Sequence, residues 1–240
     1  MTAPAAHPGR RLDGKVAVVT GAASGIGRAI ARRFVAEGSA VVGGDLDMSG
    51  LAALEDELGD GFVAAPGDAT AEEDQAAFVA TAVDRFGRLD IAVANAGTGH
   101  LAPIVDHDMA DWQRIIDLCL TGVFLTVKHA GRAMRAGTGG SIVTMASLNA
   151  VQPAAGMSAY CSAKAAVAML AEVAALELGP AGIRVNAIGP GLVQTGLTAP
   201  LWSMPDVVED FVDNTTIGRF AQPEDVADLA LFLASDESSF

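Results

Sequence analysis

The chain has one tyrosine, two cysteines and only fifteen basic residues among its 240. Cys119 and Cys161 have the spacing of neither a metal knuckle nor a disulfide framework, which favours a reducing, cytoplasmic setting. Twenty-nine acidic residues bring the net charge to −14, and such a surface repels phosphate backbones and anionic lipids. We therefore expect neither nucleic acid nor a membrane surface as a partner. The four histidines have no ligand spacing, so we expect no metal.

Long apolar runs are also absent. No stretch reaches about 18 apolar residues without a charge, so no membrane span is expected. The first eleven residues, MTAPAAHPGRR, have no apolar signal-peptide core, and we predict a flexible tail over 1–11. Half of the residues are apolar, enough for one sizeable core, so 12–240 is predicted to form a single domain.

Short apolar runs alternate with longer helical segments along the chain. We predict strands at 15–20, 40–45, 62–68, 89–97, 141–147 and 183–190. We predict helices at 24–37, 48–58, 71–86, 111–135 and 157–178. Strict alternation implies right-handed crossovers, so the predicted fold is α/β, a doubly wound parallel sheet flanked by helices.

A glycine-rich turn, TGAASGIG at 20–27, follows the first strand directly and opens the first helix. Gly21, Gly25 and Gly27 would let the backbone turn tightly and approach a pyrophosphate at the helix N-terminus. Asp45 ends the second strand, where a carboxylate can bind an adenosine ribose hydroxyl and repel a 2′-phosphate. This pattern favours NAD over NADP, although Asp45 could instead be an ordinary loop-capping residue.

The single tyrosine, Tyr160, stands four residues before Lys164 on a predicted helix, so the two side chains share a face. Lowering the pKa of a phenol from about 10 to about 7 requires about 4 kcal/mol. One ammonium about 4 Å away supplies that energy at an effective dielectric of about 20. Ser147 ends the fifth strand, at the sheet edge where ligands bind. Singly, these residues could be an interface tyrosine, a solvated lysine and a strand-end serine.

Together with ANAG (94–97) and PGLVQT (190–195), these motifs resemble the short-chain dehydrogenase/reductase family, with its Rossmann fold, from about Leu12 to Phe240. The resemblance implies hydride transfer between nicotinamide C4 and a secondary alcohol or ketone. By this resemblance, Tyr160 is the general acid/base, Lys164 binds the nicotinamide ribose and Ser147 orients the substrate.

The same resemblance implies a set of cofactor contacts, in which Asp68 binds the adenine amino group and Thr195 the carboxamide. The full set is Gly21, Ser24, Gly25, Ile26, Gly27, Asp45, Asp68, Ala69, Asn95, Ala96, Gly97, Tyr160, Lys164, Pro190, Gly191, Val193 and Thr195.

Two features depart from the family pattern. Cys119, in the run DLCLTG, occupies the place of an asparagine that supports a water in the proton relay. We expect its thiol to be a small buried apolar group, and the backbone carbonyl of residue 119 to hold the water so that turnover survives. The family also continues beyond the position of Phe240 into a last parallel strand. We therefore expect an exposed edge on the sixth strand, and greater stability in a longer product.

Substrate contacts are expected from loops 98–107 and 148–158 and from a lid at about 192–216. The lid has no Lys or Arg, which indicates a neutral, partly apolar substrate. His100 and His107 could contact it, or could simply be solvated. The two long helices, 111–135 and 157–178, are rich in Ala and Gly, and in similar proteins they form subunit contacts. We therefore expect a homo-oligomer, a dimer or a tetramer.

Two other functions remain open. Lys128, Arg132 and Arg135 form a basic helix end that could receive the acidic carrier protein of a 3-oxoacyl thioester reductase. Basic residues are also expected near a helix C-terminus because of the helix dipole. The predicted preference for NAD counts against a 3-oxoacyl thioester reductase. A catalytically silent NAD-binding regulatory protein is the third possibility, and Cys119 is its only support.

Overall fold

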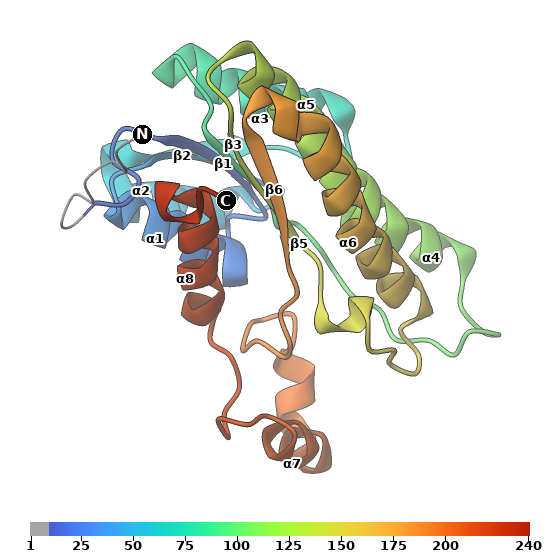
Figure 1. Cartoon of the computed structure of the whole chain (residues 1–240). Coiled ribbons are helices and arrows are strands. Elements are labelled where there is room, and N and C mark those ends of the chain that lie inside the picture. The colour runs from blue at the N-terminus through green and yellow to red at the C-terminus, as the bar shows by residue number, and fades with distance from the viewer. Residues whose placement is uncertain (1–9) are drawn as a thin grey trace.

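Six parallel strands form one sheet in the order β3-β2-β1-β4-β5-β6 (Figure 1). The computed structural model describes residues 10–240, apart from the side chains of residues 203, 205–207 and 210. The strands are β1 (Val16–Thr20), β2 (Ala40–Asp45), β3 (Phe62–Pro66), β4 (Ile91–Ala94), β5 (Gly140–Met145) and β6 (Ile183–Ile188). The predicted α/β class and all six predicted strands are confirmed.

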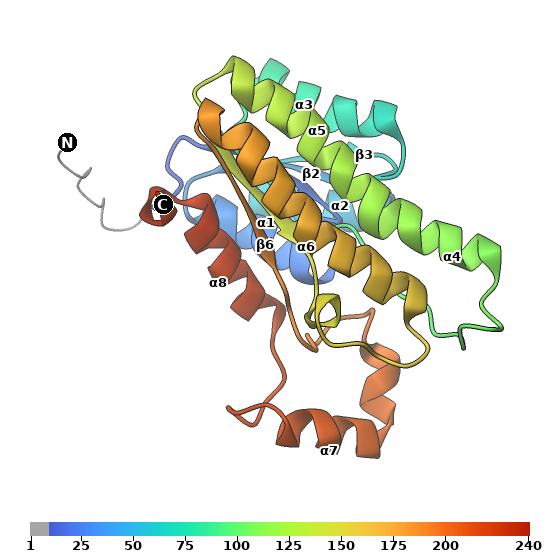
Figure 2. The same ribbon diagram turned by 45° about the vertical axis from the view of Figure 1, so that its right-hand side comes forward.

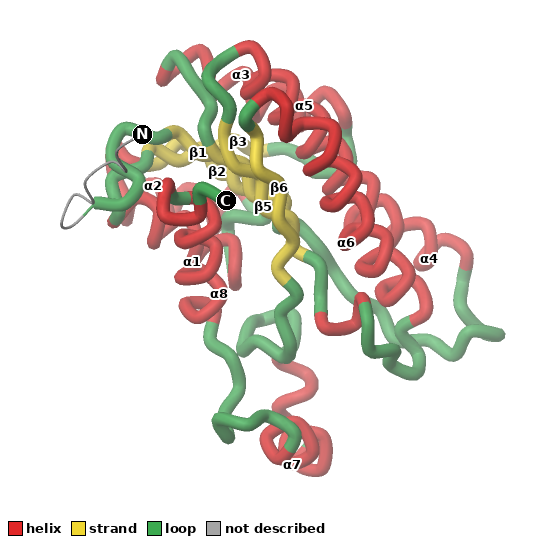
Figure 3. Tube along the Cα trace, viewed as in Figure 1, coloured by secondary structure: helices red, strands yellow, loops and turns green. Residues whose placement is uncertain are grey.

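Helices cover both faces of the sheet (Figures 2 and 3). Helices α1, α2 and α8 share a core with one face, and α3, α5 and α6 share a core with the other. The helices are α1 (Gly25–Ala36), α2 (Met48–Leu58), α3 (Glu72–Phe86), α4 (Met109–Ile116), α5 (Gly122–Ala136), α6 (Ser158–Leu178), α7 (Pro205–Asp213) and α8 (Pro223–Ala234).

The central strand β1 shows why the short runs are so apolar. Val16 and Val18 belong to the core under α3, α5 and α6, whereas Ala17 and Val19 belong to the core under α1 and α8. Successive side chains of a strand point to opposite faces. A strand covered on both faces is therefore apolar along most of its length, and β1 is apolar except for Thr20 at its end.

The strand order reverses at β1, which pairs with β2 on one side and β4 on the other. The connections that follow β1 and β4 consequently leave toward opposite faces of the sheet. In doubly wound sheets this switch point opens a crevice at the carboxyl ends of the strands.

One predicted helix differs from the observed one. The pattern predicts a continuous helix over 111–135, but the chain forms α4, then a π-helical turn (Asp117–Thr121), then α5. A π turn inserts an extra residue without interrupting the apolar pattern, so periodicity does not reveal it. Its centre is Cys119.

Among the described residues, one helical stretch (Ser158–Ala181, mean hydropathy 1.4) is long and apolar enough to cross a membrane by length and composition alone. Core helices meet the same criterion. This one buries Ala163, Val167 and Ala171 and packs against β6 and α5.

The two ends of the described chain meet beside α1. The backbone N–H of Arg11 donates to Glu37 Oε2 at 2.9 Å, and the Arg11 guanidinium pairs with Glu237. Leu12 is fully buried, where the predicted domain begins. Residues 1–9 of the predicted tail lie outside the described residues.

At one edge of the sheet, β6 has β5 as its only partner among the described strands.

Candidate active site

The glycine-rich turn between β1 and α1 has no room for side chains. Gly21 and Gly25 adopt positive φ angles of 68° and 52°. A Cβ on Gly27 would lie 2.0 Å from the carbonyl oxygen of Gly21, so only glycine lets α1 start against the turn. No side chain caps α1 at Ser24, and its first turn has no acidic residue. The start of α1 is thus suited to an anion such as a pyrophosphate.

Asn95, directly after β4, connects this turn to the neighbouring strand. Its side-chain amide donates to the carbonyl oxygens of Thr20 (2.9 Å) and Gly21 (3.3 Å). In return, the Thr20 hydroxyl accepts from the backbone N–H groups of Asn95 and Ala96 at 3.0 and 3.1 Å. The two loops on either side of the switch point therefore form one rigid unit.

Two carboxylates border the crevice at the ends of β2 and β3. Asp45 accepts backbone hydrogen bonds from Ala23 (Oδ2, 2.9 Å) and Asp47 (Oδ1, 3.0 Å). Asp68 accepts from the backbone N–H and the hydroxyl of Thr70, both at 2.8 Å. Backbone donors thus fix Asp45 beside the glycine turn, and Thr70 fixes the orientation of Asp68.

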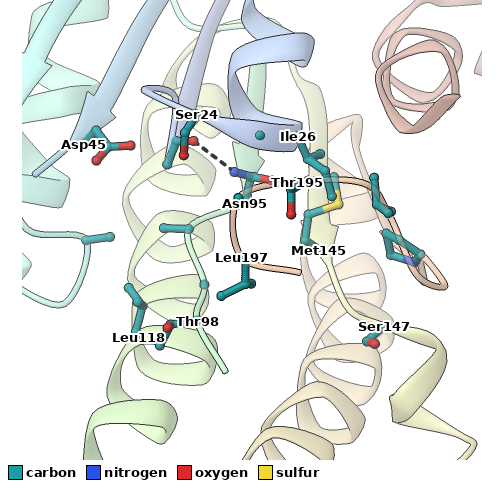
Figure 4. A pocket seen from close by; sticks show the side chains of 18 of the residues that line it. Ser24, Ile26, Asp45, Asn95, Thr98, Leu118, Met145, Ser147, Thr195 and Leu197 are labelled. Atoms are coloured by element: carbon teal, nitrogen blue, oxygen red, sulfur yellow. Dashed lines mark hydrogen bonds between the residues drawn. The ribbon is translucent and has the colours of Figure 1, made fainter. Parts of the chain in front are cut away.

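A single cavity of about 340 Å³ runs along the carboxyl ends of the strands. Asp45 and Ser147 lie at opposite ends of it, with Asn95, Thr195 and Met145 between them (Figure 4). It is lined by every residue that the sequence predicts for the site except Gly27, which is covered by the turn, and the buried Cys119. Residues from seven separate stretches of sequence therefore meet in one cleft, as the motifs predict.

At one end of the cleft, Ser147 and Tyr160 lie beside a buried ammonium. Lys164 is 3% exposed, and its Nζ lies 5.6 Å from the centre of the Tyr160 ring. Nζ donates to the carbonyl oxygen of Met145 at 2.7 Å. The Ser147 side chain accepts from the backbone N–H of Asn149 at 3.1 Å, which holds its oxygen at the start of a short 3-10 turn.

The pKa of the phenol shifts in the direction opposite to the expected one. Burial raises the pKa of Tyr160 above its ordinary value, while hydrogen bonding with Ser147 acts the other way. Burial also lowers the pKa of Lys164. An attraction between the two groups would favour the phenolate, but the cost of removing the phenolate from water opposes it and has the largest effect on the pKa of Tyr160. The site therefore favours the protonated phenol.

Cys119 is fully buried in the π turn, as expected, but its thiol is not merely an apolar group. Sγ donates to the carbonyl oxygen of Thr98 at 3.2 Å and accepts from the backbone N–H of Thr98 at 3.4 Å. The position of a Cβ on Gly97 lies 3.6 Å from Lys164 Nζ and 3.7 Å from this sulfur. The thiol thus fixes the backbone that follows Gly97, directly beside the ammonium.

Thr98 and Leu197 line the cleft and belong to the substrate loops predicted at 98–107 and 192–216. The sequence did not predict six other lining residues: Gly44, Leu46, Gly67, Leu118, Met145 and Ala146. Met145 contributes a carbonyl oxygen, which no side-chain motif reveals.

The two loop histidines lie outside the cleft lining. His100 Nε2 is 3.4 Å from Asp111, and His107 Nδ1 is 3.3 Å from the Ser158 hydroxyl. In the described part of the chain, no group of three or more His, Cys, Asp or Glu side chains could hold a metal ion.

Comparison with known proteins places this cleft in a family. A family model described as enoyl-(acyl carrier protein) reductase matches residues 21–240. A 3-alpha-(or 20-beta)-hydroxysteroid dehydrogenase of Mycobacterium bovis is 42% identical over 96% of this chain and 86% of its own length. A cis-4-hydroxycyclohexanecarboxylate dehydrogenase of Sinomonas cyclohexanicum is 43% identical over 97% of this chain and 94% of its own.

Solved structures agree. The crystal structure of a short-chain type dehydrogenase/reductase from Mycobacterium marinum matches with a TM-score of 0.89 at 35% identity, and the match covers 95% of this chain and 91% of that one. Fold and cleft together define an oxidoreductase that acts on CH–OH groups with a nicotinamide cofactor. The chain belongs to the short-chain dehydrogenase/reductase family.

Proposed function

We propose that the protein transfers a hydride between NAD(H) and a neutral secondary alcohol or ketone, with Tyr160 as general acid/base. One observation carries this proposal: Ser147, Tyr160 and Lys164 line the same cleft as the glycine turn and Asp45. The two named relatives are dehydrogenases of hydroxylated rings, which supports the reaction class.

Each residue at the catalytic end has a distinct task. The bound nicotinamide supplies or accepts the hydride. In reduction, the Tyr160 hydroxyl donates its proton to the substrate oxygen, and in oxidation the phenolate removes it. The Ser147 hydroxyl donates a hydrogen bond to the same oxygen and orients it. Lys164 holds the nicotinamide ribose and, as a buried cation, stabilises the phenolate that remains after proton transfer.

The cofactor set is the one implied by the family resemblance, from Gly21 to Thr195, and its chemistry favours NAD. The Asp45 carboxylate would accept from a ribose hydroxyl and repel a 2′-phosphate. Its neighbour Leu46 is 69% exposed and carries no charge, and Ala22 and Ala23 fill the turn. A 2′-phosphate would therefore meet a carboxylate and no basic side chain on these segments.

A homo-oligomer, dimer or tetramer, is supported by the outer face of α6. Met169, Val173 and Leu176 recur there at helical spacing and are 57%, 42% and 79% exposed. The opposite face of the same helix is buried on the sheet. A second apolar stripe on a helix whose first stripe is already covered is suited to a subunit contact.

The proposed lid at 192–216 begins and ends at one point. Val193 and Ala221 form an isolated parallel bridge, and Gln194 N–H donates to the Ala221 carbonyl at 2.8 Å. Between these ends, α7 extends beyond the carboxyl end of the sheet (Figure 1). A segment tied at its base can move without disturbing the sheet.

We further propose that residues 12–240 form a single domain and that the protein works in the cytoplasm.

Absorbance at the nicotinamide band tests the proposal, with NADH and NADPH assayed separately over cyclic and linear ketones. We expect oxidation of NADH by neutral ketones and little activity with NADPH. The Asp45→Ala variant should lose the preference for NADH while Asp47→Ala, two residues away, should keep it. Binding of NADH without turnover of any ketone or alcohol would contradict the enzyme and favour the silent regulator. Turnover confined to 3-oxoacyl thioesters would favour the thioester reductase.

A further inference from the structure

An apolar rim lies on the loops at the same end of the sheet as the cleft. It consists of exposed side chains from the loops that follow β4, β5 and β6, and these side chains are 39% to 87% exposed. Its members are Leu101, Ile104, Val105, Leu148, Val151 and Leu197. Single exposed apolar residues are ordinary, but a group of them around a binding site marks a contact surface.

Hydrogen bonds join the three loops into one surface. Ala102 N–H donates to the Gly156 carbonyl at 2.9 Å, which holds the loop after β4 against the loop after β5. Leu148 N–H donates to the Pro190 carbonyl at 2.8 Å, which holds the loop after β5 against the end of β6. Figures 1 and 2 both show the three loops at the same end of the sheet.

The rim is continuous with the catalytic residues. Leu148 directly follows Ser147, and Leu197 itself lines the cleft. A substrate with its reacting oxygen at Tyr160 would therefore extend over apolar side chains as it leaves the cleft.

The rim offers no partner for an anion. Segments 95–108, 147–157 and 189–218 contain no Lys or Arg. The two histidines of the first segment lie beside Asp111 and Ser158. Lys164 is buried and donates to Met145. A carboxylate placed on the rim would lose its hydration and gain no counter-ion.

We propose that the rim selects extended, uncharged, apolar alcohols and ketones of at least two fused rings, and disfavours substrates with a carboxylate. The inference rests on the proposed function and specifies its substrate class. The names of the two relatives give two candidate substrates, a hydroxysteroid and a hydroxycyclohexanecarboxylate. An apolar rim without basic residues favours the hydroxysteroid.

The test compares four ketones with NADH and the purified full chain: cyclohexanone, 2-decalone, a 3-ketosteroid and 4-oxocyclohexanecarboxylate. Catalytic efficiency kcat/KM should rise with ring number and be lowest for the carboxylate. The variant Val105→Asn/Val151→Asn changes two residues that are 87% and 84% exposed. It should raise KM for the steroid about tenfold, the effect of an apolar group in a hydrophobic site. Its kcat/KM for cyclohexanone should not change.

Two further variants provide a control away from the rim and a test of the missing positive charge. Val83→Asn replaces an exposed valine on α3, away from the rim, and should leave every KM unchanged. Val151→Arg supplies the missing cation and should raise kcat/KM for the carboxylate selectively.

Two results would overturn the inference: equal efficiency for cyclohexanone and the larger ketones, or an unchanged steroid KM in the double rim variant. Turnover of cyclohexanone under either result would leave the proposed function intact. Inactivity toward all four ketones with bound NADH would also overturn the inference, and the wider panel of linear ketones and alcohols would then decide on the proposed function.

Discussion

At the scale of single residues, the proposed chemistry depends on a phenol and an ammonium that are both removed from water. Burial favours the neutral form of each group, so the pKa of Tyr160 is raised and that of Lys164 is lowered. A phenol that keeps its proton is ready to donate it to a ketone. The protonation of Tyr160 is thus set by its surroundings as well as by its ordinary pKa.

The rates in the two directions should depend on pH with opposite sign. Reduction needs the protonated phenol, so it should hold through neutral pH and fall as the pH rises through the pKa of Tyr160. Oxidation needs the phenolate, so it should increase with pH into the alkaline range. The measurement is kcat/KM in both directions between about pH 5 and about pH 12. An oxidation rate that is already constant below neutral pH would contradict this.

Cys119 should permit turnover although asparagine is usual at its position. Its two hydrogen bonds to Thr98 hold the loop in place, and we expect its backbone carbonyl to hold a relay water. We predict that Cys119→Asn changes kcat by less than about tenfold, with Cys161→Asn, outside the π turn, as the control. An increase of several powers of ten over a nearly inactive parent would show that the thiol breaks the relay.

Single residues were partly predictable. The spacing of Tyr160 and Lys164 and the strand-end position of Ser147 placed all three in the cleft. The sign of the phenol pKa was not predictable, because it depends on burial by surrounding chain rather than on the neighbour four residues away. The hydrogen bond from Lys164 Nζ to the Met145 carbonyl oxygen could not be predicted for the same reason.

At the scale of elements, the β1–α1 turn determines whether the cofactor end of the cleft can form. The three glycines have different constraints: two need positive φ, and Gly27 has no space for a Cβ. The sequence predicted this element almost completely, because only glycine satisfies those constraints. The π turn between α4 and α5 was missed, because its extra residue leaves the apolar spacing nearly unchanged.

Gly27→Ala should damage both folding and cofactor binding. The added Cβ would meet the Gly21 carbonyl at 2.0 Å and the Asn95 amide at 2.6 Å, so the turn must shift. We expect the free energy of unfolding to fall by about 1–3 kcal/mol, measured by denaturant titration. Gly179→Ala is the control, because nothing lies within 4 Å of its Cβ position. Equal stability of the two variants would contradict the account of the turn.

At the scale of the whole molecule, the alternation of strands and helices was sufficient to predict a doubly wound sheet. The motifs then predicted which edge of the sheet carries the site. The position of α7 could not be predicted, because few contacts tie this helix to the sheet. Helix α6 also bears on the assembly of the protein, because it has apolar side chains on two faces.

A charge on the outer face of α6 should dissociate the oligomer. Leu176→Glu places a carboxylate on a residue that is 79% exposed in the single chain, so the fold of each subunit should be unaffected. We predict a shift from dimer or tetramer to monomer by light scattering at micromolar concentration. Val83→Glu on α3 serves as the control. A monomeric parent protein would contradict the proposal directly.

The most direct test of the central claim is single-turnover reduction of a neutral ketone by the Tyr160→Phe variant, with NADH binding measured by fluorescence on the same sample. Removal of the hydroxyl keeps the ring that packs beside Lys164 but removes the proton donor. The account predicts that NADH binding is retained and that the rate of hydride transfer falls by about 10²- to 10⁴-fold, the contribution of general acid catalysis. A variant that binds NADH and reduces the ketone as fast as the parent would contradict it.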